Sequence, residues 1–214
     1  MDVKPTLYLV TDRAGISAEI LLQKVESALK GGVTMVQLRE KDCSTVEYLE
    51  LARAVHEITS RYHVPLLIND RADIALAAGA EGLHVGTDDM PVKEARKLMG
   101  ADKIIGATAK TVERAKCAER DGADYLGVGA IFASSVKSNT KITDLESVKD
   151  ICESVSIPVV AISGINRGNL DVLIGSPIQG IAVITAIMGA ADSEAEARFL
   201  KRDIHEKILD HSRF

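Results

Sequence analysis

Three polar side chains follow an apolar run at intervals of two residues, and their types suit a ligand with several negative charges. Gln37, Arg39 and Lys41 come directly after the run that ends at Val36. In an extended chain, residues two apart project from the same face. An amide and two cations that converge in this way predict a site for a polyanion. The structural alternative is a salt bridge from either cation to Glu40, to Asp42 or to a carboxylate at a neighbouring strand end.

Two carboxylates follow the next two apolar runs, and together they predict a magnesium site. Asp70 lies just after the run that ends at Ile68, and Asp89 lies just after the run that ends at Val85. Proteins usually hold Mg²⁺ with one or two carboxylates, and the oxygens of a bound phosphate complete its coordination. As alternatives, Asp70 could cap the helix that follows it, and Asp89 could belong with Asp88 to a solvated turn.

Further donors and one more cation complete the predicted diphosphate site. Lys137 adds positive charge, and Asn69 and Thr108 add neutral hydrogen-bond donors. Lys137 is preferred to Lys141, which lies in the same loop, on spacing alone. His84 fits two interpretations equally well, as a core histidine or as a substrate contact.

A second anion site is predicted near the end of the chain. The turn Ser163-Gly164 follows an apolar run and opens a helical segment, and Ile184-Thr185 ends the last apolar run. If the strands form a barrel, phosphates commonly bind at this pair of strand ends through backbone N–H groups. The alternative for Gly164 is a tight turn without a ligand.

The elements that must position these residues alternate between strand-like and helix-like segments. Eight short apolar runs have the length and composition of strands: Thr6–Val10, Val33–Leu38, Pro65–Ile68, Gly82–Val85, Lys103–Gly106, Asp124–Val128, Pro158–Ile162 and Gly180–Ile184. Segments with helical periodicity separate or follow them: Ala18–Lys30, Thr45–Tyr62, Arg71–Ala78, Val92–Leu98, Val112–Asp121, Leu145–Ser154, Gly168–Leu173 and Ser193–Leu209.

This alternation predicts an α/β fold of parallel strands, and eight units predict a single (β/α)₈ TIM barrel. We expect one catalytic domain over residues 1–214, because no segment resembles a linker. An open, doubly wound sheet is the alternative. Glycine-containing helix ends that lead directly into strands favour the barrel. Thr11-Asp12-Arg13 follows the first strand where a GxGxxG pattern would be expected for dinucleotide binding, which weakens that interpretation.

Composition limits the classes of function. The chain has 214 residues, of which 46% are hydrophobic, enough to bury a sizeable core. Its formal net charge of −5 argues against a general nucleic-acid binder. No apolar run reaches the ~18 residues of a membrane span. The 3 cysteines lack the spacing of a disulfide framework or a zinc site. We therefore expect a soluble, cytoplasmic protein that acts on small molecules and binds neither nucleic acid nor membrane.

Five motifs stand in a recognisable order along nearly the whole chain: Gln37–Lys41, Ile68–Asp70, Gly82–Gly86 followed by Asp88-Asp89, Asp124–Gly127 running on to Lys137, and Ile162–Ile165. Together they resemble the thiamine phosphate synthase family. The resemblance implies a (β/α)₈ barrel that joins hydroxymethylpyrimidine diphosphate to a thiazole phosphate. The products are thiamine phosphate and diphosphate, and the reaction uses Mg²⁺. The implied enzyme is a transferase.

The resemblance also implies roles for single residues. Catalysis depends on three cations that neutralise the departing diphosphate: Arg39, Lys41 and Lys137. The pyrimidine diphosphate contacts Gln37 on the ring side, and Arg39, Lys41, Asn69, His84, Thr108 and Lys137. The thiazole phosphate contacts Ser134, Ser135, Val136, Gly164, Ile184 and Thr185, and Mg²⁺ contacts Asp70 and Asp89. The implied mechanism is a dissociative substitution: diphosphate leaves, the aminopyrimidine stabilises the methylene cation, and the thiazole nitrogen attacks.

Departures from the family pattern keep two alternatives open. Val136 lacks the hydroxyl of the usual Thr, so a barrel that only binds thiamine precursors is one alternative. The other is the related thiazole tautomerase, which shares the barrel but uses neither a diphosphate substrate nor Mg²⁺. It resembles a type that has a His where this chain has Lys110. The complete charged set favours the synthase. Either the thiazole phosphate or its carboxylated form fits as substrate, and a homo-oligomer is compatible with the sequence.

Overall fold

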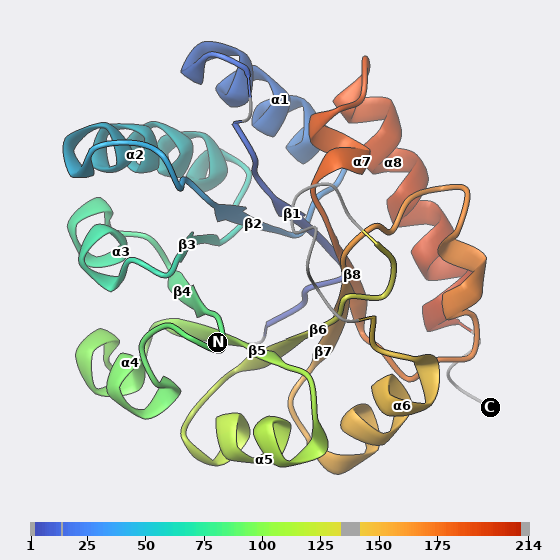
Figure 1. Ribbon diagram of the computed structural model, residues 1–214. Coiled ribbons are helices and arrows are strands. Elements are labelled where there is room, and N and C mark those ends of the chain that lie inside the picture. The colour runs from blue at the N-terminus through green and yellow to red at the C-terminus, as the bar shows by residue number, and fades with distance from the viewer. Residues whose placement is uncertain (1–2, 14, 134–141, 211–214) are drawn as a thin grey trace.

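The strands form a closed barrel, as the alternation of elements predicts. The computed structural model describes residues 3–13, 15–133 and 142–210. The strands pair in sequence order, all in parallel, and β1 pairs with β8 to close the ring (Figure 1). Their bounds are β1 Leu7–Val10, β2 Met35–Leu38, β3 Leu66–Asn69, β4 Gly82–Val85, β5 Ile104–Ala109, β6 Tyr125–Val128, β7 Val159–Ile162 and β8 Gly180–Val183. The (β/α)₈ prediction is confirmed, and the open sheet is excluded.

Helices surround the barrel on its outside (Figure 1). They are α1 Ala18–Lys30, α2 Thr45–Arg61, α3 Ala72–Ala78, α4 Val92–Met99, α5 Val112–Arg120, α6 Leu145–Ser154, the 3₁₀ helix η1 Leu170–Leu173, α7 Thr185–Met188, α8 Ser193–Ile204 and the π-helical η2 His205–Leu209. In the described part of the chain, no helix is long and apolar enough to cross a membrane.

Three elements differ from the prediction. The segment Gly168–Leu173 forms only the short 3₁₀ helix η1. The four-residue α7 was not predicted, because a single turn is too short for its periodicity to be detected. Strand β5 continues to Ala109, so Thr108 lies within the strand and not beyond it.

Local sequence signals explain where several helices begin. Ser17, Ser44, Asp144 and Asp192 precede α1, α2, α6 and α8, and each side chain accepts a hydrogen bond from a backbone N–H of the first turn. At α2, the Glu47 side chain accepts a hydrogen bond from the backbone N–H of Ser44, which completes a capping box. These signals fix the helix starts that follow the strand-end loops β1–α1, β2–α2 and β6–α6.

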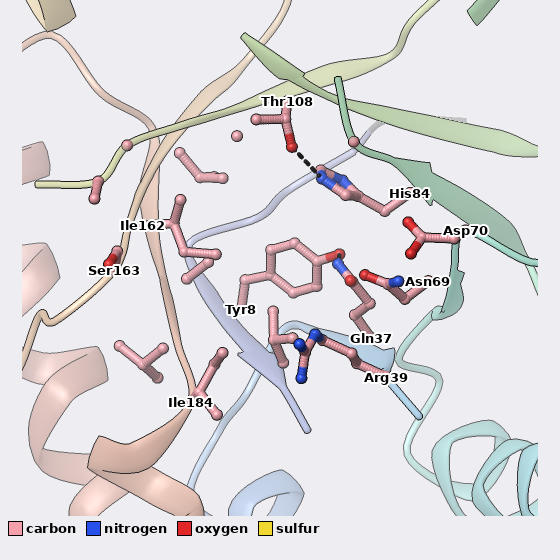
Figure 2. A pocket seen from close by; sticks show the side chains of 18 of the residues that line it. Tyr8, Gln37, Arg39, Asn69, Asp70, His84, Thr108, Ile162, Ser163 and Ile184 are labelled. Carbon is pink, nitrogen blue, oxygen red and sulfur yellow. Dashed lines mark hydrogen bonds between the residues drawn. The ribbon is translucent and has the colours of Figure 1, made fainter. Parts of the chain in front are cut away.

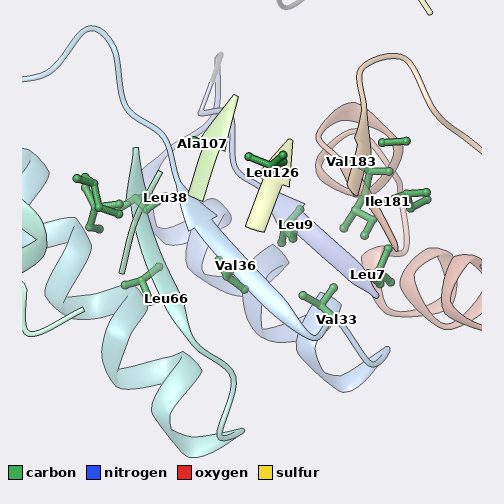
Figure 3. Packing of buried hydrophobic residues seen from close by; sticks show 14 of the residues in the cluster. Leu7, Leu9, Val33, Val36, Leu38, Leu66, Ala107, Leu126, Ile181 and Val183 are labelled. Atoms are coloured by element: carbon green, nitrogen blue, oxygen red, sulfur yellow. The ribbon is translucent and has the colours of Figure 1, made fainter. Parts of the chain in front are cut away.

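Along each strand, side chains alternate between two packed regions. Outward-facing residues such as Leu9, Val36 and Leu66 belong to the larger core between strands and helices (Figure 3). Inward-facing residues, among them Tyr8 and Tyr125, fill the barrel itself. This is the two-residue period of a strand in a closed barrel. Because side chains pack the interior, a ligand finds room only at an end of the barrel.

One inward position carries no side chain because a neighbour occupies its space. Gly106 of β5 lies in register with Tyr125 of β6. A methyl group on Gly106 would overlap the ring of Tyr125. The glycine therefore allows the fully buried Tyr125 side chain to extend into the interior.

We predict that Gly106→Ala destabilises the protein, because the added methyl group forces the Tyr125 ring or the β5 backbone to move. Overpacking of this kind costs about 1–3 kcal/mol. Gly127→Ala on β6 is the matched control, since the nearest atom to its methyl group would be a His84 ring carbon at 3.4 Å. Urea denaturation should show a lower free energy of unfolding for Gly106→Ala than for the control. Equal values for both variants would contradict the packing argument.

Candidate active site

A cavity of about 300 Å³ opens at the C-terminal end of the barrel strands, where the site was predicted (Figure 2). Every strand contributes to its lining. The lining includes these predicted site residues: Gln37, Arg39, Lys41, Asn69, Asp70, His84, Asp89, Thr108, Gly164, Ile184 and Thr185. The predicted residues Ser134, Ser135, Val136 and Lys137 lie outside the described residues. The barrel thus brings together side chains that are far apart in the sequence.

Arg39 and Lys41 line the same side of the cavity but differ in their partners. The Nζ atom of Lys41 lies 2.6 Å from Oδ2 of Asp70. For Lys41, the salt-bridge alternative is therefore realised, with the carboxylate that follows the neighbouring strand. Within the described residues, Arg39 forms no such ion pair, and its backbone N–H donates to Oγ1 of the buried Thr11 at 3.1 Å. The Arg39 side chain can thus bind an anion without first breaking a salt bridge.

Glu40 anchors the same loop on the side away from the cavity. Its carboxylate pairs with Nε of Arg13 at 3.0 Å, and its side chain is only 4% exposed. Burial raises the pKa of Glu40, although the Arg13 guanidinium opposes this shift. Its second carboxylate oxygen, Oε1, is buried without a hydrogen bond. Glu40 thus pairs with Arg13 and lies outside the described cavity lining, which contains Arg39 and Lys41.

Asp70 and Asp89 lie close enough to affect each other's protonation. Burial would raise the pKa of Asp70, but hydrogen bonds from Lys41 and with Asp89 hold it below its ordinary value. Burial and the neighbouring Asp70 raise the pKa of Asp89. Two carboxylates therefore meet here, and Lys41 offers its ammonium group to only one of them.

The structural alternatives apply differently to the two carboxylates, and the magnesium site stays a prediction. The N-cap position of α3 is Arg71, so Asp70 does not cap that helix. Oδ2 of Asp89 accepts a hydrogen bond from the N–H of Gly86 at 2.8 Å, so the turn interpretation holds for that oxygen. In the described ranges, no group of three or more His, Cys, Asp or Glu side chains could hold a metal ion. A Mg²⁺ ion at this pair would take its remaining ligands from substrate oxygens and water.

A chain of polar side chains crosses the barrel beneath the cavity. Nε2 of Gln37 donates to the Tyr8 hydroxyl at 2.5 Å, and the hydroxyls of Tyr8 and Tyr125 are 2.7 Å apart. The Tyr125 hydroxyl lies 2.8 Å from Nδ1 of His84. Nε2 of His84 lies 3.1 Å from Oγ1 of Thr108, as the dashed line in Figure 2 shows. His84 is thus hydrogen-bonded inside the barrel and also lines the cavity, and its role as a substrate contact stays a prediction.

The hydrogen bonds of this chain have a preferred direction. Because the Gln37 amide donates to Tyr8, the Tyr8 hydroxyl can donate to Tyr125, and Tyr125 can donate to Nδ1 of His84. An imidazole with its proton on Nε2 would then donate to Oγ1 of Thr108. Burial raises the pKa of Tyr8 and Tyr125, so both phenols stay protonated.

Tyr8 and Tyr125 are the residues that the sequence analysis missed. Tyr8 lines the cavity, and Tyr125 supports it from below through His84. A usable signal was present: both residues occupy inward positions of apolar strands, in a chain with only 4 tyrosines and no tryptophan. A phenol placed there needs a hydrogen-bond partner inside the barrel.

The second predicted anion site lies across the cavity, since β7 stands four strands from β3 in the ring of eight (Figure 2). Ser163 and Gly164 follow β7 with φ of 87° and 70°, in the left-handed region. A methyl group on Gly164 would lie 2.7 Å from the carbonyl oxygen of Ala133 and from Cβ of Phe132. Gly164 is therefore required by the turn itself, and this turn also faces the cavity.

Comparisons with known proteins agree with this geometry. Residues 7–187 match the model of the family described as thiamine monophosphate synthase. A relative in Streptococcus pneumoniae, thiamine-phosphate synthase 2, is 52% identical over 199 residues, which cover 93% of this chain and 95% of the relative. A thiamine-phosphate synthase of Clostridium tetani is 51% identical over 187 residues, which cover 87% of this chain and 90% of the relative.

Solved structures extend the comparison. A thiamine phosphate pyrophosphorylase from Pyrococcus furiosus superposes with a TM-score of 0.87 at 38% identity, covering 95% of this chain and 96% of that chain. A 3-hexulose-6-phosphate synthase superposes with a TM-score of 0.70 at 18% identity, covering 92% of this chain and 98% of that chain. At that identity, the second likeness shows the fold alone.

We predict that Tyr125→Phe lowers the free energy of unfolding by about 1–3 kcal/mol, because it leaves the Tyr8 hydroxyl and Nδ1 of His84 without their shared partner. Tyr62→Phe is the control, since its hydroxyl makes one long hydrogen bond of 3.3 Å to Glu26. In urea denaturation, the Tyr8→Phe/Tyr125→Phe double variant should lose less stability than the sum of the two single variants. Strictly additive losses would contradict the direct contact of the two hydroxyls.

Proposed function

We propose that the chain, which belongs to the thiamine monophosphate synthase family, forms thiamine phosphate in the cavity at the C-terminal end of its barrel. The family's reaction is a transfer, in which the pyrimidinylmethyl group leaves diphosphate and joins the nitrogen of a thiazole phosphate. One observation carries the proposal for the site: cations and carboxylates follow β2 to β4, and a backbone turn faces them from β7. Each substrate brings one anion to such a cavity.

The β2–β5 side is proposed to hold the diphosphate. Arg39 and Lys41 would neutralise its charge, and Asn69 and Thr108 would donate hydrogen bonds. Negative charge grows on the leaving oxygen as the carbon–oxygen bond breaks, so cations already fixed there favour the transition state. Lys137 is a prediction from the sequence for the same role.

Asp70 and Asp89 are the proposed ligands of Mg²⁺. Such an ion, when bound, supplies charge compensation for the diphosphate oxygens. The proposal is supported by the arrangement of the charges, because two neighbouring carboxylates share one adjacent ammonium group, which pairs with Asp70 alone. Asp70 and Lys41 both line the cavity, where they lie side by side.

The pyrimidine ring is proposed to rest on the polar chain beneath the cavity. Gln37, Tyr8 and His84 line that region with uncharged donors and acceptors. In a dissociative substitution the aminopyrimidine itself stabilises the methylene cation, so side chains need not exchange protons with it. The work of the protein is then to hold the two rings in line and to keep the diphosphate neutralised.

The β7–β8 side is proposed to bind the thiazole phosphate. Gly164, Ile184 and Thr185 line it, and backbone N–H groups at strand ends suit phosphate oxygens. Ser134, Ser135 and Val136 remain predictions for this half of the site. We further propose that residues 1–214 act as one catalytic domain in the cytoplasm, which is consistent with 3 free cysteines.

We predict that the purified protein, given hydroxymethylpyrimidine diphosphate, thiazole phosphate and Mg²⁺, forms thiamine phosphate and releases one diphosphate per product. Chromatography of the products and a coupled diphosphate assay measure both. Isomerisation of the thiazole without diphosphate release would indicate a tautomerase. Binding of both precursors without any product at saturating concentrations would indicate a binding protein, and either result would overturn the proposed function.

We predict that Asp89→Asn raises the Mg²⁺ concentration required for half-maximal activity at least about tenfold, because a neutral amide is a weaker ligand for a hard cation. Asp88→Asn is the matched control, since it removes the same charge from the same exposed turn. Its Mg²⁺ dependence should stay close to that of the wild type. An unchanged Mg²⁺ dependence in Asp89→Asn and in Asp70→Asn would refute the metal assignment.

A further inference from the structure

We propose that Asn169 is a positioning residue for the second anion site, and that it thereby sets the preference of the cavity for a phosphorylated thiazole over the same thiazole without phosphate. The inference rests on the proposed function, in which the turn at Gly164 receives that phosphate. Asn169 itself is not part of the cavity lining. It would act through the peptide that joins Gly164 to Ile165.

The Asn169 side chain spans the turn with both ends of its amide. Nδ2 donates to the carbonyl oxygen of Gly164 at 2.8 Å, and Oδ1 accepts from the backbone N–H of Asn166 at 2.8 Å. The exposed Asn166 side chain adds a longer hydrogen bond of 3.2 Å to the same Gly164 carbonyl. Asn169 is partly buried, so its contact is the better shielded of the two.

These hydrogen bonds fix the orientation of one peptide group. In a planar trans peptide, the C=O and the N–H point in opposite directions. Because the Gly164 carbonyl is held toward Asn169, the N–H of Ile165 is directed away from Asn169, and both Gly164 and Ile165 line the cavity. Within the described residues, the N–H groups of Gly164 and Ile165 make no hydrogen bond. They are therefore available to an anion.

The turn needs such support because its backbone is strained. Ser163 is not glycine and yet has φ of 87°, a region that side chains disfavour. A second contact holds the other end of the turn: the Ser163 hydroxyl donates to the carbonyl of Phe132 at 3.0 Å, and the Phe132 N–H donates to the carbonyl of Ser163 at 3.1 Å. With Ser163 fixed in this way, the Asn169 amide determines how the following peptide is turned.

An oriented N–H discriminates between ligands by charge. A phosphate oxygen accepts a charge-assisted hydrogen bond, whereas the hydroxyl of the unphosphorylated thiazole accepts only a neutral one. Loss of one charge-assisted hydrogen bond corresponds to about a tenfold to hundredfold loss of affinity. Asn169 should therefore affect the phosphorylated thiazole strongly, and the unphosphorylated thiazole and the pyrimidine diphosphate weakly.

The test compares Asn169→Asp and Asn169→Ala with the wild type. Asn169→Asp keeps the acceptor for the Asn166 N–H but replaces the donor to Gly164 with a second acceptor. The Gly164 carbonyl then keeps only the longer hydrogen bond from the exposed Asn166 side chain, so the peptide is held less firmly. Gln179→Ala is the matched control, because Gln179 accepts from the backbone N–H of Val159 at 2.6 Å at the opposite end of β7. Circular dichroism and thermal unfolding establish that each variant is folded. If the Asn169→Asp variant does not fold, Asn169→Ala serves as the test, because it also removes the donor to Gly164.

The first readout is kinetic. In both Asn169 variants, KM for thiazole phosphate should rise about tenfold to hundredfold. KM for the pyrimidine diphosphate should stay within about twofold, and kcat/KM for the unphosphorylated thiazole should change little. Gln179→Ala should leave the ratio of kcat/KM for the two thiazoles unchanged. An unchanged ratio in the Asn169 variants, or an equal rise in both KM values, would overturn the inference.

The second readout does not depend on activity. Titration of ¹⁵N-labelled wild type with inorganic phosphate should shift the amide resonances of Gly164 and Ile165, and the Asn169 variants should need about tenfold more phosphate for the same shift. If the wild type makes no thiamine phosphate but shows this difference, the proposed function fails and the role of Asn169 stands. If the wild type is active and the variants need the same phosphate concentration as the wild type, the proposed role of Asn169 is wrong and the proposed function stands.

Discussion

Closure of the barrel between β1 and β8 is the constraint on which the rest of the structure depends. Leu7 pairs with Ile181 in parallel register, so the C-terminal ends of all eight strands lie on one rim. The two-residue period of each strand then decides which side chains reach the interior. On β1, Tyr8 faces inward and Leu9 faces the helices. Residues that are distant in sequence thus meet at one cavity, although the sequence itself carries no long-range signal of this. Barrel closure also brings the hydroxyls of Tyr8 and Tyr125 into contact.

The rim carries both cations and carboxylates, so a bound anion and a bound cation could each find opposite charges there. Glu40 is removed from the cavity by its pairing with Arg13, which preserves the positive charge of Arg39 for a ligand. Lys41 pairs with Asp70, and burial together with the neighbouring Asp70 raises the pKa of Asp89. Such a site favours a ligand that brings several negative charges together with a divalent cation. On the far side of the ring, the anion would meet backbone N–H groups and no fixed side-chain charge among the described residues.

The sequence predicted the fold well because strands and helices of a barrel carry strong local periodicity. All eight strands and the long helices were found, with boundaries shifted by a few residues. The exceptions have physical causes: α7 is too short for a periodic pattern, and Gly168–Leu173 tightens into a 3₁₀ helix where the Asn side chains close the turn. Within the site, charged residues at strand ends were predictable from spacing. The hydrogen bond between Tyr8 and Tyr125, and the choice of Asp70 as the partner of Lys41, were not, because they depend on distances across the ring.

The central claim is that two anions bind on opposite sides of one cavity and that the carboxylates serve the diphosphate side. Diffraction from crystals soaked in inorganic diphosphate and Mn²⁺ tests it most directly, because Mn²⁺ can replace Mg²⁺ and is located by its anomalous scattering. We expect an anomalous peak between Asp70 and Asp89, with diphosphate bound against Arg39 and Lys41. Diphosphate bound only at the Gly164 turn, with no metal at the carboxylates, would contradict it.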